Sequence, residues 1–104
     1  MIFRDATHRR RALDAANWLT AHMDRLPKPA AGREAYHDAV ETFILEMAQH
    51  RPWQPSTCRE DWRGGRFALM GFKASSTMGL PAAVRNWIRQ VQDKAVQSEH
   101  ASVA

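Results

Sequence analysis

The strongest pattern of apolar and polar positions lies in residues 80–96, LPAAVRNWIRQVQDKAV. Apolar residues recur there every three or four positions, which is the spacing of one buried stripe on an α-helix. The stripe consists of Val84, Trp87, Ile88, Val91 and Ala95. Pro81 suits the first turn of a helix, where its missing N–H costs no hydrogen bond. The pattern therefore predicts a C-terminal helix with a buried Trp87 side and a polar side that faces water.

Two stretches in the first half of the chain show the same helical spacing. Residues 5–26 place alanine, leucine and methionine on one side of a helix that Asp5 or Thr7 can cap. Residues 33–50 form a second stripe with larger apolar side chains such as Phe43. The connection between them holds two prolines and a glycine, which end the first helix. Because that connection is short, we expect the two helices to pack antiparallel.

The segment between the second and the last helix is less regular. Residues 51–65 contain prolines and a Gly-Gly pair, and Thr57 followed by Glu60 has the spacing of a capping box, which predicts one helical turn. Residues 66–75, RFALMGFKAS, fit either a short helix or a short apolar strand. We favour the helix because the sequence shows no clear partner strand. Residues 97–104 are small and polar and are expected to fray.

These elements predict a single all-α domain over residues 1–96, followed by the tail at 97–104. The expected architecture is a small bundle of about four helices, of which the third is short and irregular. A chain of 104 residues suits one domain of this kind. The expected core consists of Leu19, Met23, Val40, Phe43, Ile44, Met47, Phe67, Met70, Val84, Trp87, Ile88 and Val91.

Composition adds an expectation about where the protein works. No apolar run approaches the roughly 18 residues that a membrane span needs, and the first residues turn charged at once, unlike a signal peptide. A single cysteine, Cys58, excludes an internal disulfide. We therefore expect a cytoplasmic protein with no membrane partner.

Positive charge is concentrated in the second half of the chain. The net charge is +4, and residues 51–94 hold eight basic against three acidic residues. Residues 28–50 are acidic overall, with two basic against four acidic residues. This asymmetry suits an anionic partner. Twelve arginines against three lysines, together with seventeen alanines, are also typical of a GC-rich, bacterial-type genome.

The sequence offers little support for catalytic or metal chemistry. Histidine and cysteine occur without the close pairing of a zinc motif, and Glu34 with His37 makes a single Glu-x-x-His where di-iron bundles use two. Arg59 could lower the pKa of its neighbour Cys58, but no histidine lies near in the sequence. No P-loop or Gly-x-Ser-x-Gly is present. We expect no enzyme activity, no catalytic residue, no cofactor, no metal and no small-molecule substrate.

Nucleic-acid binding is the function that the charge pattern favours. Cations alternate with aromatic residues between positions 59 and 73, and cations hold phosphates while aromatic rings stack on bases. The polar side of the last helix offers Arg for guanine and Asn or Gln for adenine. We predict a small DNA- or RNA-binding protein, with a regulatory role as one option. The candidate contacts are Arg59, Arg63, Arg66, Lys73, Arg85, Asn86, Arg89 and Gln90. The alternative is that the aromatic residues belong to the core and the arginines only solvate a loop.

Residues 74–87 also resemble a helix-turn-helix, the DNA-binding motif whose second helix enters the major groove. The resemblance rests on the small residue Ala74, on apolar Val84 and Trp87 further along, and on the ending VRNWIRQV. Met78 stands where the motif usually has glycine. The resemblance implies that the C-terminal helix is the one that reads bases.

A second interpretation is a non-enzymatic interaction module or inhibitor that docks to another protein or to itself. Four tryptophans are many for a chain of 104 residues, and tryptophan often anchors interfaces. The candidate contact residues are Trp18, Trp53 and Trp62.

Overall fold

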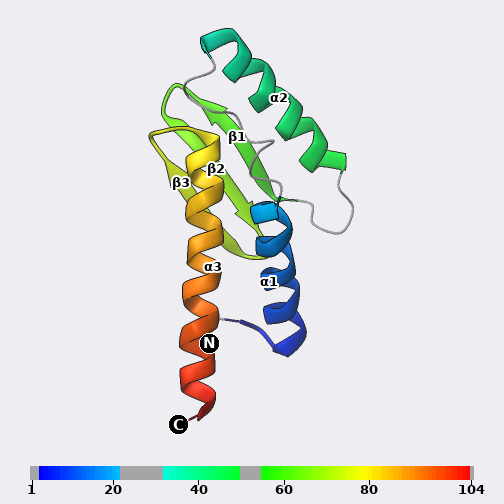
Figure 1. The fold of residues 1–104 in the computed structure, drawn as a ribbon, viewed down its shortest axis with the longest axis vertical. Helices are drawn as coiled ribbons and strands as arrows, with labels where there is room; N and C mark the ends of the chain where they lie inside the picture. Colours follow the sequence, from blue (N-terminus) through cyan, green and yellow to red (C-terminus); the bar gives the residue numbers. More distant parts are fainter. Residues whose placement is uncertain (1–2, 22–31, 50–54, 104) are drawn as a thin grey trace.

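The protein is a layer of helices on one face of a three-stranded antiparallel sheet (Figure 1). The computed structural model describes residues 3–21, 32–49 and 55–103, with side chains up to residue 97. The sheet has the order β1-β2-β3, so each strand pairs with its neighbour in the sequence. The elements in chain order are α1 (Ala6–Ala21), α2 (Arg33–Gln49), β1 (Thr57–Asp61), β2 (Gly64–Leu69), β3 (Phe72–Ser76) and α3 (Leu80–Val103).

The predicted all-α helical bundle is therefore wrong, and the fold is α+β. Residues 66–75, expected as a short third helix, belong to β2 and β3 and the turn between them. The partner strand that the sequence did not reveal is β1, whose letters TCRED carry no apolar run. Thr57 and Glu60 do not start a helical turn, because they pair with Ala68 and Gly65 of β2.

Two left-handed residues close the turn between β2 and β3. Met70 has φ 53° and Gly71 has φ 85°, and positive φ at both central residues is the geometry of a tight two-residue hairpin. The backbone O of Met70 lies 2.9 Å from Nε2 of His8 in α1, which ties the turn to the helix layer. Ala74 then lies in β3, so the residues that resembled a helix-turn-helix form a strand followed by a single helix.

The core lies between the sheet and α3. Trp87 is fully buried, meets the ring of Phe67 edge-on at 5.7 Å, and donates from Nε1 to the backbone O of Leu69 at 3.2 Å. This is the buried side that the apolar stripe predicted, and α3 continues as a helix through the expected tail as far as Val103. Burial of one such aromatic side chain contributes roughly 2–3 kcal/mol, so Trp87 adds substantially to the packing of α3 on the sheet.

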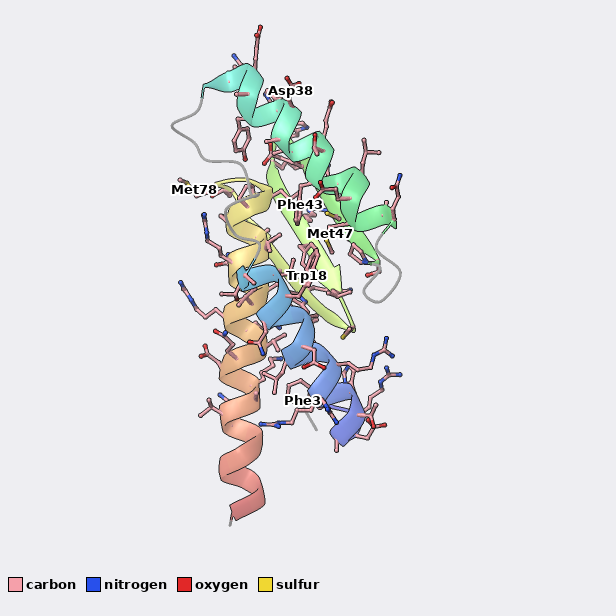
Figure 2. The ribbon with its side chains drawn as sticks, turned by 45° about the vertical axis from the view of Figure 1, so that its right-hand side comes forward. Phe3, Trp18, Asp38, Phe43, Met47 and Met78 are labelled. Carbon is pink, nitrogen blue, oxygen red and sulfur yellow. The ribbon has the colours of Figure 1, made fainter. Side chains whose placement is uncertain are left out.

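The first two helices do not form the antiparallel pair that the short connection suggested. α1 packs along α3 through Ala12, Ala15 and Ala16, which are fully buried and small enough to let the helices approach closely. α2 lies instead against β1, and Figure 2 shows Phe43 and Met47 on the side of α2 that faces the sheet.

Most of the expected core is confirmed. Leu19, Val40, Phe43, Met47, Phe67, Val84, Trp87, Ile88 and Val91 are buried. Ile44 and Met70 are partly buried against this cluster, while Met23 lies outside the described residues.

The N-terminus of α3 lies directly against β2 at Gly65. A Cβ atom at Gly65 would overlap the backbone N and Cα of Leu80, so no side chain fits between the strand and the helix. Glu60 of β1 reaches the same point, where its Oε1 accepts the Leu80 N–H at 2.7 Å and the Tyr36 hydroxyl at 2.6 Å. One carboxylate thus caps α3 and links it to α2 and β1, in the place where a helix dipole favours negative charge.

We expect Gly65→Ala to lower the free energy of unfolding by about 3 kcal/mol or more, because the added methyl meets backbone rather than a movable side chain. The matched variant is Gly71→Ala, where a Cβ meets nothing within 4 Å and only the positive φ is strained. That variant should lose about 1 kcal/mol. Urea titrations followed by circular dichroism measure both, and equal losses would contradict the close contact.

Candidate nucleic-acid interface

Side-chain alternation along the strands divides the sheet into two chemically different faces. Phe67, Leu69 and Phe72 point to the inner face, where they are buried against the helix layer. The opposite surface, called the outer face below, is almost entirely polar. By register and alternation it consists of Thr57, Arg59 and Asp61 from β1, Gly64, Arg66 and Ala68 from β2, and Lys73 and Ser75 from β3.

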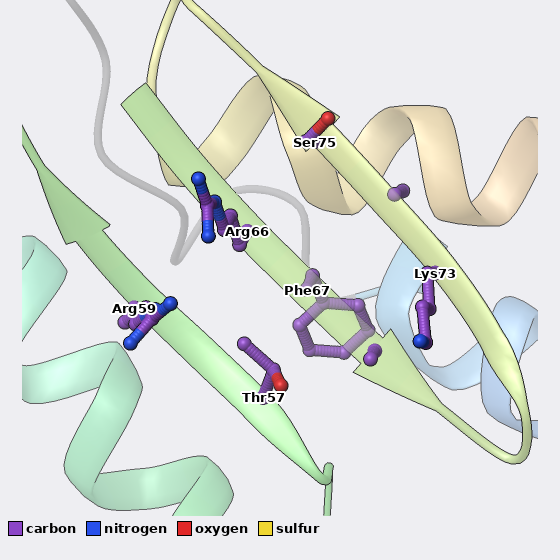
Figure 3. A pocket seen from close by; sticks show the side chains of 8 residues that line it. Thr57, Arg59, Arg66, Phe67, Lys73 and Ser75 are labelled. Atoms are coloured by element: carbon purple, nitrogen blue, oxygen red, sulfur yellow. The ribbon is translucent and has the colours of Figure 1, made fainter. Parts of the chain in front are cut away.

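Three cations from three different strands meet on this outer face. Arg59 and Arg66 are directly opposite each other in the β1–β2 register, and Lys73 lies on β3 opposite Ala68. All three are exposed, and together with Thr57 and Ser75 they line a shallow hollow of about 460 Å³ (Figure 3). Figure 3 shows α3 on the far side of the sheet from these side chains.

The three cations of this face outnumber its one carboxylate, Asp61, and none of them is paired within the described part of the chain. No described residue forms an ion pair or a side-chain hydrogen bond with Arg59, Arg66 or Lys73. Asp61, the acidic residue at one end of the face, accepts the backbone N–H of Arg63 at 2.8 Å. Like charges directly opposite each other on a sheet destabilise it, so the Arg59–Arg66 pair costs stability in the free protein. An anion bound on the outer face would relieve the repulsion between the two guanidinium groups.

The structure separates the remaining predicted contacts from this face. Because the buried stripe of α3 faces the sheet, helical periodicity places Arg85 and Arg89 on its solvent side, and both are exposed. Asn86 donates from Nδ2 to the backbone O of Ser75 at 3.1 Å, and Gln90 is half-buried. The predicted set therefore divides between two sides of the molecule, with the sheet cations on one and the α3 arginines on the other.

Arg63 and Trp62 lie in the turn between β1 and β2. The guanidinium of Arg63 sits 5.3 Å from the centre of the Trp62 ring, and that ring is 90% exposed. Met78, which is 77% exposed, lines the same hollow of about 450 Å³ as Trp62, and Figure 2 shows Met78 projecting from the β3–α3 connection. Of the other predicted interface tryptophans, Trp18 is half-buried against the core, and Trp53 lies outside the described residues.

Cys58 is a poor nucleophile in this environment. It points to the inner face, away from Arg59, and burial raises its pKa to about 12. The suggestion that Arg59 lowers the pKa of this thiol is therefore wrong, because adjacent residues of a strand point to opposite faces. Among the residues that the structure describes, no three or more His, Cys, Asp or Glu side chains gather as metal ligands, and no helix could cross a membrane.

The sequence pattern missed three polar members of the outer face, Thr57, Asp61 and Ser75. GGRFAL alternates with period two and so separates Arg66 from Phe67, but TCRED shows no such alternation, so Thr57 could be grouped with Arg59 only after the strand pairing was known. In β2 and β3 the cations and aromatics alternate because Phe67 and Phe72 face the core while Arg66 and Lys73 face solvent, whereas Trp62 in the β1–β2 turn is exposed together with Arg63. Phe67 is therefore not a stacking partner for a base.

Comparison with protein-family models, with curated proteins and with solved structures yields no match. The functional assignment therefore depends on the geometry and charge of the chain itself.

We expect Cys58 in the folded protein to react with a thiol reagent at pH 8 about a thousandfold more slowly than in urea, because its pKa rises from 9.0 to about 12. The raised pKa of Cys58 also makes the stability of the fold depend on pH. The buried neutral thiol contributes its full share to the free energy of unfolding below pH 9, and this share is lost as the pH rises toward 12. Absorbance assays with a chromogenic disulfide measure the rates, and Cys58→Ser provides the blank. Equal rates in the two conditions would contradict the buried thiol.

Proposed function

We propose that the protein binds nucleic acid through the outer face of its sheet. The observation that carries the proposal is the presence of three exposed cations, Arg59, Arg66 and Lys73, on one polar sheet face. Exposed Arg and Lys side chains bind phosphate groups and release condensed counterions, which supplies most of the affinity in sequence-independent binding. The excess of basic residues in positions 51–94 extends this field beyond the three contacts.

The proposal differs from the sequence-based prediction in where the contact lies. The sequence predicts one interface that combines the cations at positions 59–73 with the exposed side of α3, which carries Arg85 and Arg89. These residues project from the helix layer, whereas Arg59 and Arg66 project from the opposite side of the sheet. A single straight nucleic acid that follows the outer face does not reach the solvent side of α3, so the two sets are separable by mutation.

We expect the protein to bind fluorescein-labelled 20-mers, and its affinity to fall about 20- to 40-fold between 50 and 200 mM salt if its three cations together release three condensed counterions from the nucleic acid. In the variant Arg59→Gln/Arg66→Gln the affinity should fall only a few-fold over the same range of salt, because two of the three cations are removed. Fluorescence anisotropy at several salt concentrations measures both. Arg85→Gln/Arg89→Gln is the matched control, since it removes the same charge from the other side of the molecule and should retain most of the wild-type salt dependence.

Two results would overturn the assignment. The first is no binding at 50 mM salt to single-stranded DNA, duplex DNA or duplex RNA. The second is an equal loss of affinity in the two double variants, which would mean that binding depends on the net charge of the protein and not on the outer face.

Self-association through the turn between β1 and β2 is a second candidate function. One observation favours it: Trp62 and Met78 are both strongly exposed and line one hollow at the same end of the sheet. Large apolar side chains exposed next to each other often mark interaction surfaces, and tryptophan is a frequent anchor in them.

If this surface joins two copies, light scattering after size exclusion should give a dimer mass for the wild type and a monomer mass for Trp62→Ala/Met78→Ala. Leu45→Ala is the control, because Leu45 is also exposed but lies on α2 away from the hollow. At a protein concentration of ~10⁻⁴ M, an interface that contributes about 6 kcal/mol would hold much of the protein as a dimer. A wild type that is still monomeric at this concentration excludes self-association.

A further inference from the structure

We infer that the nucleic acid is duplex DNA and that the outer face of the sheet enters its major groove. This inference rests on the proposed function and adds the class of ligand and the way it docks. It follows from three properties of the outer face, which are the absence of aromatic rings from its described strand positions, its width, and the donors that it presents.

The described strands offer no platform on the outer face on which bases could stack. Among these strand residues, both aromatic side chains, Phe67 and Phe72, are buried on the inner face. Proteins that bind single strands combine cations with exposed aromatic rings on which successive bases stack. The exposed ring nearest to these strands, Trp62, lies in the turn beyond β1, where the guanidinium of Arg63 sits over it. A face whose strand positions carry arginine, lysine, hydroxyl groups and one carboxylate, but no ring, is suited to a ligand whose bases are already stacked, which is a duplex.

The β1–β2 pair has the width that the major groove of B-form DNA accepts. Its two strands lie about 4.8 Å apart and carry Arg59 and Arg66, while β3 lies at the edge of the sheet. The major groove of B-DNA is about 12 Å wide and admits a two-stranded β-ribbon. The major groove of A-form RNA is deep and too narrow for side chains to read, so duplex RNA does not accept the same face.

The donors on the face suit the floor and walls of that groove. Arg59 and Arg66, directly opposite each other, present two guanidinium groups from the β1–β2 pair, and each can donate two hydrogen bonds to O6 and N7 of guanine. Lys73 on β3 carries a single charged group, which suits a phosphate at the side of the groove. Thr57 and Ser75 add hydroxyl groups that can contact bases or phosphates.

The first experiment compares three labelled 20-mers of one sequence, namely duplex DNA, single-stranded DNA and duplex RNA, by anisotropy at 50 mM salt. We expect duplex DNA to bind about tenfold more tightly than the other two, or better. Methyl green, which occupies the major groove, should displace the protein, whereas netropsin, which occupies the minor groove, should not.

The second experiment replaces guanine in the duplex by 7-deazaguanine, which lacks the N7 acceptor. Wild-type affinity should fall about fivefold or more. Arg59→Lys/Arg66→Lys keeps the positive charge but removes the bidentate guanidinium donors. That variant should therefore bind the guanine and the 7-deazaguanine duplex with equal affinity. The control Arg85→Lys/Arg89→Lys should distinguish them as the wild type does.

The outcomes separate this inference from the proposed function. Equal or tighter binding of single-stranded DNA or duplex RNA, displacement by netropsin, or indifference of the wild type to 7-deazaguanine overturns the major-groove inference and leaves the nucleic-acid proposal standing. Failure of all three ligands to bind overturns the proposed function itself.

Discussion

The contact between β2 and the first turn of α3 is the constraint on which the rest of the structure depends. At Gly65 the strand and the helix touch through their backbones, because any side chain there would overlap Leu80. This approach fixes the start of α3 against the sheet, and two turns further along Trp87 donates from Nε1 to the backbone O of Leu69. Glu60 stabilises the same point by capping α3, and its second hydrogen bond brings in Tyr36 of α2.

Covering one face of the sheet determines what the other face can be. Every apolar strand side chain that contacts α3 leaves its neighbours in the strand pointing outward, because the direction of side chains alternates. Those neighbours include Arg59, Arg66 and Lys73, which would be costly to bury without partners. Packing of the helix layer on the inner face therefore stabilises the domain, while the outer face exposes the charged side chains to solvent. The repulsion between the paired arginines is a cost that the well-packed inner face tolerates.

The error in the predicted fold class came from one source. Local periodicity reveals helices, and each of the three long helices begins within one residue of its predicted start. The strands are five or six residues long, and the letters of β1 are polar on both faces, so no window contained enough signal. The short apolar run in β2 and β3 was then assigned to a helix, because its partner strand could not be recognised.

The sequence alone determined the long helices, the burial of Trp87, the concentration of positive charge in the second half and the identity of the candidate cations. These properties depend on composition and on spacing within one element. Only the tertiary structure decided that three short segments form a sheet, and that Arg59, Arg66 and Lys73 share one face while Arg85 and Arg89 lie on another side. The physical reason is that strand pairing and the choice of a buried face depend on contacts between residues distant in the chain, which local periodicity does not encode.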